Sequence, residues 1–271
     1  MTNIEKFYDK YAQYEWDRLE HNKITFAITM RAFQEYILNP PIKILDVGGG
    51  PGRYAIALAL QNNDITLMDL SQKCLEFAKV KAKKAGAKRL CYSQGTATDL
   101  SQFPHKQFDV VLLMGPLYHL LSFNSRKLAL KESRNVLKSD GLIFAAFITR
   151  FEPIRFAAKY DPRWIIDSQH RLEELLTTGI LTASSDRGGF TDAYYSHPSE
   201  IIPFMESCGF ETLNLISCEG IINMIDEKIS NLWRWSKNLR QIIIQFYRSF
   251  QELMRDTGTT NIKTKMNLVI Y

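Results

Sequence analysis

Residues 44–53 read ILDVGGGPGR, and this stretch decides which fold we expect. Four glycines and one proline stand within the five positions 48–52, directly after a short apolar run. Glycine at such density is costly in conformational entropy, so something must approach this backbone more closely than side chains would allow. The run 42–47, IKILDV, is nearly all apolar, as a strand buried on both faces requires. We therefore expect a buried strand that leads into a ligand-binding loop.

The segments after this loop alternate between apolar strands and helices. We predict strands at 64–71, within 88–100, at 108–114 and at 141–148, and helices at 54–61, 71–86 and 125–141. Ser125 is a candidate N-cap of the last helix, and Gly141 lies beyond its end. Short strand–helix units in this order are typical of an α/β fold with a doubly wound, mostly parallel sheet.

The flanking segments complete a single domain over residues 1–271. Residues 1–40 are predicted to form an N-terminal helical cap, because apolar residues recur at helical spacing before Pro40 and Pro41. Residues 41–150 form the core. Residues 151–197 are rich in aromatic and charged residues without a clear strand, which favours an inserted lid. Residues 198–271 should supply C-terminal helices and closing strands, with 263–271 running antiparallel beside 211–217.

Composition limits the partners of the chain. The net charge is +5, from 34 basic and 29 acidic residues, which is mild for 271 residues and does not call for nucleic acid. The basic run 79–89 is expected to be a solvated helix face. The four cysteines lack the spacing of a metal site, so we expect reduced thiols and no metal. With neither a signal peptide nor an apolar span, we expect a cytoplasmic protein that makes no use of a membrane.

The spacing of the glycines distinguishes two kinds of nucleotide site. A dinucleotide loop needs G-x-G-x-x-G, but Arg53 stands where the third glycine would be. The frame Asp46-x-Gly48-x-Gly50-x-Gly52 fits completely, with the acid at the end of the strand. This frame resembles the first motif of the class I S-adenosylmethionine-dependent methyltransferases.

The resemblance continues in order over roughly residues 40–150. The later matches are Met68-Asp69-Leu70-Ser71 at the second strand end, the segment 95–100 (GTATDL), Phe108-Asp109-Val110-Val111 at the fourth strand, and 115–120 (GPLYHL). The resemblance implies a Rossmann-like, seven-stranded sheet and S-adenosylmethionine as the cofactor. The whole-chain pattern looks like bacterial small-molecule methyltransferases.

The resemblance also implies roles in cofactor binding. Asp69 would accept hydrogen bonds from the ribose hydroxyls, and Asp99 would accept one from the adenine amine. The implied cofactor contacts are Tyr11, Asp46, Gly48, Gly49, Gly50, Arg53, Asp69, Leu70, Thr98, Asp99, Leu100 and Met114. Tyr8, Tyr14 and Tyr118 are further aromatic candidates for the sulfonium.

Each assignment has a purely structural alternative. Asp46 would then brace the glycine loop, Asp69 would cap the next helix, and Asp99 would be a turn residue. Tyr8, Tyr11 and Glu15 share one helical face, as the residues of any packed helix do. Arg53 would be a solvated residue at a helix start.

The segment after the fourth strand narrows the choice of methyl acceptor. This stretch, 114–120 (MGPLYHL), contains neither the NPPY-type motif of base-amine methylation nor a Pro-Cys nucleophile, and it lacks the acids of a metal-dependent catechol site. We therefore expect O- or N-methylation of a small molecule. The lid aromatics that would enclose it are Phe151, Phe156, Tyr160, Trp164, Phe190, Tyr194 and Tyr195.

His119 is the first candidate for a general base, with Tyr118 beside it and His197 and His170 as further histidines. A packed, hydrogen-bonded His119 is the alternative. Three other functions stay open: a nicotinamide oxidoreductase, a catalytically silent cofactor-binding protein, and an RNA or protein methyltransferase. The last would use an aromatic and basic surface of Trp233, Arg234, Trp235, Lys237 and Arg240. The sequence leaves the oligomeric state open.

Overall fold

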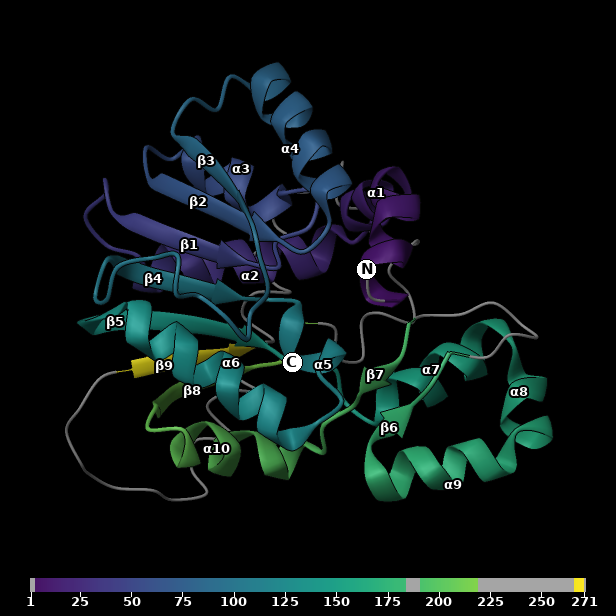
Figure 1. Ribbon diagram of the computed structural model, residues 1–271. Helices are drawn as coiled ribbons and strands as arrows, with labels where there is room; N and C mark the ends of the chain where they lie inside the picture. The colour runs from purple at the N-terminus through teal and green to yellow at the C-terminus, as the bar shows by residue number, and fades with distance from the viewer. Residues whose placement is uncertain (1–2, 184–190, 219–265, 271) are drawn as a thin grey trace, which may run out of the picture.

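The computed structural model describes residues 3–183, 191–218 and 266–270. Seven strands form the central sheet in the order β3-β2-β1-β4-β5-β9-β8. Their bounds are β1 Lys43–Val47, β2 Asp64–Asp69, β3 Leu90–Gln94, β4 Phe108–Leu113, β5 Leu137–Ala146, β8 Glu211–Ile216 and β9 Met266–Ile270. Figure 1 shows this sheet between two layers of helices.

The sheet is doubly wound, which confirms the predicted fold class. The chain moves outward from β1 to β2 and β3, and then returns to add β4 and β5 on the other side. Where the strand order reverses, between β1 and β4, the carboxyl ends of the strands form the usual ligand-binding edge of such folds. The predicted antiparallel closing strand is wrong: β9 pairs in parallel with both β5 and β8.

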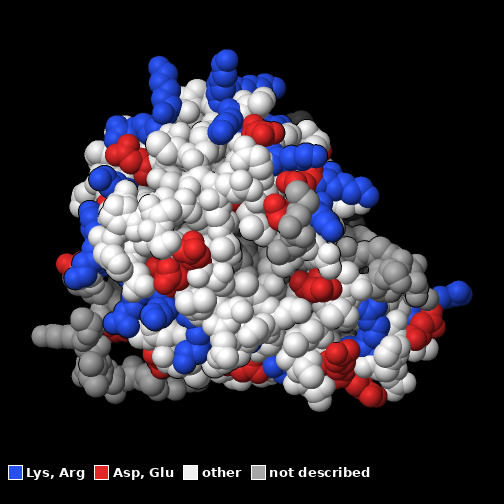
Figure 2. Space-filling model, viewed as in Figure 1, with Lys and Arg blue, Asp and Glu red and all other residues white. Residues whose placement is uncertain are grey.

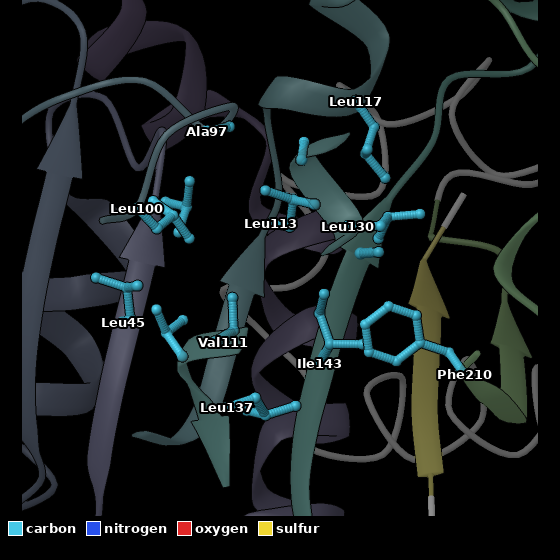
Figure 3. Packing of buried hydrophobic residues seen from close by; sticks show 14 of the residues in the cluster. Leu45, Ala97, Leu100, Val111, Leu113, Leu117, Leu130, Leu137, Ile143 and Phe210 are labelled. Atoms are coloured by element: carbon cyan, nitrogen blue, oxygen red, sulfur yellow. The ribbon is translucent and has the colours of Figure 1, made fainter. Parts of the chain in front are cut away.

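Alternation along the strands divides the core into two layers. Leu45, Val111 and Ile143 belong to the cluster that packs under α6 (Phe123–Val136) and α10 (Pro198–Ser207). Figure 3 shows these side chains on one side of the sheet, together with Leu130 and Phe210. The intervening residues, such as Ile44 and Phe144, join the opposite cluster. This period of two explains why the strands read as continuous apolar runs in the sequence.

The opposite layer contains α2 (Lys23–Tyr36), α3 (Arg53–Ala59) and α4 (Gln72–Ala85), with α1 (Asn3–His21) beside α4. The predicted N-terminal helical cap over residues 1–40 thus consists of two helices, separated at Asn22. Lys79, Lys83 and Lys84 are exposed on α4 and its end, where basic side chains project from the molecule in Figure 2. These three lysines form a solvated helix face, as expected, whereas Lys81 of the same run is half-buried and lies 4.6 Å from the centre of the Trp16 ring.

The boundary between α6 and β5 differs from the prediction. The helix begins at Phe123 after Ser122, not at Ser125, and it ends at Val136 instead of continuing to Gly141. Leu137 already belongs to β5, where it pairs with Phe108 and is 6% exposed. Burial in the sheet therefore outweighs the helical propensity of the residues after Val136.

The insert, residues 151–197, contains α7 (Phe151–Tyr160), α8 (Pro162–Asp167), α9 (Gln169–Thr178) and a small antiparallel pair of β6 (Ile180–Leu181) and β7 (Ala193–Tyr194). The sequence predicts no strand here, because two-residue strands leave no periodic pattern. The insert lies beside α5 (Pro116–His119), near the ends to which the strand arrows point (Figure 1). Phe190 and the Trp233–Arg240 surface lie outside the described residues.

Two features are absent from the described residues. No helix within them is long and apolar enough to span a bilayer. Within the same ranges, no group of three or more His, Cys, Asp or Glu side chains is placed to hold a metal ion. All four cysteines, at positions 74, 91, 208 and 218, are free thiols.

Candidate active site

The glycine loop after β1 needs glycine for two different reasons. Gly48 has φ +66°, and a Cβ there would fall 2.6 Å from Cγ of Pro116, so α5 and the loop are in direct contact. Gly50 has φ +55°, but no atom lies within 4 Å of the place where its Cβ would be. Gly48 is therefore required by close packing, while Gly50 leaves open space beside a left-handed backbone. That space lies at the ligand-binding edge of the sheet.

Asp69, the last residue of β2, holds this loop in place. Its Oδ2 accepts a hydrogen bond of 2.8 Å from the Gly50 amide, and its Oδ1 accepts one of 2.8 Å from the Ser71 amide. Burial raises the pKa of Asp69 to about 6, although the two amide bonds oppose that shift. A carboxylate oxygen can accept two hydrogen bonds, so each oxygen keeps capacity for a ligand hydroxyl. Asp69 also precedes the helix capped by Ser71, but its own bonds reach the loop.

Asp46 lies behind the loop. It is 1% exposed, and neither of its carboxylate oxygens has a hydrogen-bond partner among the described residues. A Cβ at Gly49 would fall 2.5 Å from its Oδ2, so the carboxyl packs directly against the loop. Burial, and then the charge of Asp69, raise the pKa of Asp46 to about 7. These contacts favour the bracing alternative for Asp46 over direct contact with a ligand.

The loop after β3 is a tight turn closed by its own residues. Asp99 donates its amide to the Thr96 carbonyl (3.1 Å), and its Oδ1 accepts the Ser101 amide (3.0 Å). The hydrogen bonds from Ser101 hold the pKa of the exposed Asp99 carboxyl below its usual value. The Thr98 hydroxyl lies 3.1 Å from that of Thr96. Asp99 thus has the contacts of a turn residue, with its other oxygen available to a ligand.

Three further predicted cofactor contacts differ in how exposed their side chains are: Leu70, Leu100 and Met114. The Leu100 side chain is 1% exposed and lies in the core, and its amide donates to Glu132 (3.1 Å). Leu70 is half-buried and its carbonyl accepts a bond of 3.0 Å from Gln94. Met114 is half-buried against the opposite core cluster. A ligand would therefore meet Leu70 and Met114 more readily than the Leu100 side chain.

Arg53 is bound to the helical layer instead of lying free in solvent. Its guanidinium lies 4.1 Å from the centre of the Phe26 ring, and that ring stacks on Tyr54 at 5.4 Å. Burial lowers the pKa of Arg53. The solvated alternative for Arg53 is therefore incomplete, because an aromatic pair fixes the cation beside the loop.

His119, the last residue of α5, joins three parts of the molecule. Its Nε2 lies 2.8 Å from the Tyr8 hydroxyl of α1, and its Nδ1 lies 3.0 Å from the Thr191 hydroxyl of the insert. Burial lowers the pKa of His119 to about 4, so the ring is neutral near pH 7. Burial also raises the pKa of Tyr8 well above its usual value and that of Tyr118 to about 12. Both phenols therefore keep their protons.

Known methyltransferases are similar to this chain in sequence and in fold. Residues 44–141 match the family model of a methyltransferase domain. The ubiquinone biosynthesis O-methyltransferase of Azorhizobium caulinodans is 28% identical over 153 residues, 55% of this chain and 58% of that protein. That of Rickettsia canadensis is 26% identical over 73% of this chain and 72% of the relative. An S-adenosylmethionine-dependent methyltransferase structure from Methanosarcina mazei superposes with a TM-score of 0.54 at 21% identity, covering 66% of this chain and 84% of that one.

The methyltransferase-domain match over residues 44–141, together with the fold shared with S-adenosylmethionine-dependent methyltransferases, supports the class I S-adenosylmethionine-dependent methyltransferase family for this chain. S-adenosylmethionine is the cofactor of this family. The matches therefore disfavour the alternative function of a nicotinamide oxidoreductase. This chain matches a little over half the length of the Azorhizobium relative. The matched residues 44–141 include the glycine loop, the Asp69 strand end and the 95–100 turn.

Tyr8, and not Tyr11, is the α1 tyrosine that reaches α5 of this methyltransferase. The Tyr11 ring lies 4.9 Å from Phe7 and 6.3 Å from Tyr14, and the backbone is non-helical at Tyr11. Tyr14 is 64% exposed. The shared helical face of Tyr8, Tyr11 and Glu15 gave no means of separating these residues.

His197 has a structural role in the described contacts. As the N-cap of α10 it accepts the Ser199 amide at Nδ1 (3.3 Å), and its own amide donates to Glu200 (3.3 Å). This reciprocal pair is a capping box. His170 lies in α9.

Two contacting residues were missed by sequence reasoning. Asp9 of α1 accepts a hydrogen bond of 2.5 Å from the Ser71 hydroxyl and one of 3.4 Å from the Lys73 amide, next to Asp69. Thr191 contacts His119 across 72 positions of sequence. Neither residue carries a motif, and only the tertiary fold brings each to its partner.

The expected enclosure by lid aromatics is only partly seen. Phe151, Phe156 and Tyr160 are each more than half exposed, so these rings face solvent. Trp164 is half-buried, while Tyr195 is 5% exposed and packs on Leu175 and Ala193 in a small core of the insert. Tyr194 contacts Arg126 of α6. The apolar side of helix α7 therefore does not line an enclosed pocket.

Proposed function

We propose that this methyltransferase transfers the methyl group of S-adenosylmethionine to an oxygen or nitrogen of a small molecule. The observation that carries the proposal is the open space beside Gly50, bordered by the Asp69 carboxylate, at the edge where the strand order reverses between β1 and β4. The relatives named ubiquinone biosynthesis O-methyltransferases support a small-molecule acceptor.

The residues at this edge fit the bound cofactor. Asp69 offers its remaining lone pairs to two vicinal ribose hydroxyls, and the free oxygen of Asp99 offers one to the adenine amine. The amide backbone at Gly48–Gly50 and the Arg53 cation are the groups suited to the methionine carboxylate. We assign contacts to Tyr11, Leu70, Thr98 and Met114 around these, and a bracing role to Asp46 and Gly49.

When bound, the cofactor supplies an electrophilic methyl group on a sulfonium, which an acceptor displaces in line. The protein then has to align the acceptor, and alignment alone can lower the barrier by several kcal/mol. The segment 151–197 and α1 meet at His119, so we propose that they close over the acceptor as a lid. Closure would exclude water from the reacting atoms.

His119 is suited to two roles. In the state described, it fastens α1 and the insert to α5 through Tyr8 and Thr191. To act as a general base, the ring must exchange one of these partners for the acceptor proton, because a neutral imidazole has one acceptor nitrogen. We propose that Thr191 is the partner exchanged, since it belongs to the insert.

The activity is tested with methyl-labelled S-adenosylmethionine and three fractions of a bacterial extract: small molecules, RNA and protein. We expect label to pass only to the small-molecule fraction, with S-adenosylhomocysteine formed in equal amount. Transfer to RNA or protein would instead support the alternative acceptors. Formation of no S-adenosylhomocysteine in any fraction would identify a silent binding protein.

Two histidine variants test the role of His119. His119→Ala should lower turnover strongly while leaving S-adenosylhomocysteine affinity unchanged. His105→Ala, at an exposed position away from α5, is the control and should retain full turnover. Unchanged turnover in His119→Ala would remove His119 from the catalytic residues.

A further inference from the structure

A cavity lies between α6, α10 and β7, apart from the open space beside Gly50. It shares no residue with the cofactor motifs. Its volume is about 480 Å³, within the range of small-molecule sites. The walls are mostly apolar, with three phenylalanines, an isoleucine and a proline. The lining residues used below are Phe123, Arg126, Phe147, Ser196, Glu200 and Phe204.

The cavity has a buried floor and an exposed rim. Arg126, Phe147 and Ser196 are 5%, 6% and 4% exposed, whereas Phe123 at the mouth is 53% exposed. A ligand can therefore enter from solvent and reach polar groups that water hardly reaches. Ser196 adds a hydroxyl that makes no hydrogen bond to another described residue.

Arg126 presents one edge of its guanidinium without a partner in the described residues. Its Nη1 donates to the carbonyls of Leu120 (2.8 Å) and Leu121 (2.7 Å), which uses both hydrogens of that nitrogen. One face of the group lies 3.5 Å from the centre of the Tyr194 ring. The N–H groups of Nε and Nη2 remain, and this pair is the edge that binds a carboxylate with two parallel hydrogen bonds.

The acid of the cavity is already engaged. Glu200 pairs with Arg150 (2.5 Å), and its Oε2 accepts hydrogen bonds from the Tyr194 hydroxyl (2.8 Å) and the His197 amide (3.3 Å). Arg126 forms no ion pair with any acid in the described ranges, and burial lowers its pKa. The charges of Tyr194 and Glu200 offset this shift only in part. A buried guanidinium edge without a direct ion pair is unfavourable, and a ligand anion would correct this.

We propose that this cavity binds the carboxylate of a small aromatic acid, with the Nε–Nη2 edge of Arg126 holding the carboxylate and the phenylalanines enclosing the ring. Among the described residues, one unpaired cation faces the cavity, so a single negative charge fits it. A phosphate monoester carries more charge than a carboxylate, so the Glu200 carboxylate that lines the same cavity would repel it more strongly. Because Leu120 and Leu121 directly follow His119, the ligand would lie next to α5.

Calorimetry with benzoate, its neutral isostere benzamide and phenyl phosphate tests the proposal on the unaltered protein. We expect benzoate to bind at least about tenfold more tightly than benzamide, as a charge-assisted pair requires. Equal affinity for the two, or tighter binding of phenyl phosphate, would overturn the proposal. This comparison needs no variant, so it decides even if a substitution at Arg126 fails to fold.

Variants then locate the site. Arg126→Met should abolish the preference for benzoate, whereas Arg134→Met, an exposed arginine of the same helix, should keep it. Phe204→Ala should weaken benzoate and benzamide alike, because it removes apolar wall and no charge. An equal loss of preference in both arginine variants would indicate a general charge effect and overturn the proposal.

The site does not depend on the proposed activity. S-adenosylhomocysteine affinity, measured on the same samples, should be the same with and without benzoate bound at this separate set of residues. If benzoate fails to bind while S-adenosylhomocysteine binds, the cavity proposal fails and the proposed function stands. If benzoate binds while S-adenosylhomocysteine does not, the proposed function fails and the cavity proposal stands.

Discussion

The glycine-loop side and the α5 side of the same sheet edge are built in different ways. At the glycine loop, main-chain groups make most of the contacts: the Gly50 amide meets Asp69, and the Gly48 backbone packs on Pro116. At α5, side chains from distant segments meet: Tyr8, His119 and Thr191. The first side depends on local sequence, and the second depends on the tertiary fold.

This difference in construction explains why the cofactor side would stay constant while the acceptor side varies. A backbone cradle tolerates little change, because nearly any side chain would fill it. A meeting of side chains can be rebuilt from other residues, so different relatives can accept different acceptors on one cofactor site. Four substitutions, each with an expected outcome, test the two sides against each other.

Gly48→Ala should have the largest effect on stability. The new Cβ would meet Pro116 and adopt a left-handed backbone, so we expect a loss of about 3 kcal/mol or more in the free energy of unfolding. Gly86→Ala is the matched control, because Gly86 has φ +77° but open space around it. It should cost only about 1 kcal/mol. Denaturant unfolding of both variants measures the difference, and equal losses would contradict the close packing.

Asp46→Asn should change the pH dependence of stability. The folded-state pKa of Asp46 is raised to about 7, so its contribution is present at acidic pH and is lost as pH rises through that value. The wild-type free energy of unfolding should therefore fall between pH 5 and pH 8, and this fall should be smaller by about 2 kcal/mol in the variant. Parallel pH profiles in urea would show that Asp46 is not buried in the folded protein.

Tyr8→Phe tests the α5 side. The substitution leaves His119 Nε2 without its partner, which should cost about 1 to 2 kcal/mol of unfolding free energy. Tyr14→Phe, at a solvent-exposed ring of the same helix, should change stability little. NMR of the His119 ring nitrogens should also respond only to Tyr8→Phe. A response to both substitutions would mean that α1 does not lie on α5 as described.

His197→Ala should have the smallest effect. It removes the N-cap of α10, so we expect a loss of about 1 kcal/mol in stability. Turnover measured at a temperature where the variant is folded should stay unchanged. A strong fall in turnover would restore His197 as a catalytic candidate and contradict its role as a cap.

The sequence predicted the parts of the fold that rest on short-range patterns. Buried parallel strands showed as apolar runs, and the glycines from Gly48 to Gly52 marked the loop that follows β1. The role expected for Asp69 came from the resemblance to the methyltransferase family, whose motif matches the end of this strand. Each of these signals lies within a few residues, so a single sequence carries it.

Features that depend on long-range contacts were not predicted. Tyr8 and His119 are 111 positions apart, and no local pattern distinguishes Tyr8 from Tyr11. The direction of β9 depends on which strands it joins, and the start of β5 at Leu137 depends on pairing with Phe108. Arg126 reads as one more basic residue of an amphipathic helix, and only burial against Tyr194 sets it apart.

Calorimetry with S-adenosylhomocysteine tests whether the Gly50–Asp69 edge binds the adenosyl group. The wild-type protein should bind, and Asp69→Ala should weaken binding about 100-fold through loss of two charge-assisted hydrogen bonds. Asp64→Ala, at the other end of the same strand and paired with Arg89, should bind like wild type. No binding by the wild type, or unchanged binding by Asp69→Ala, would contradict the account.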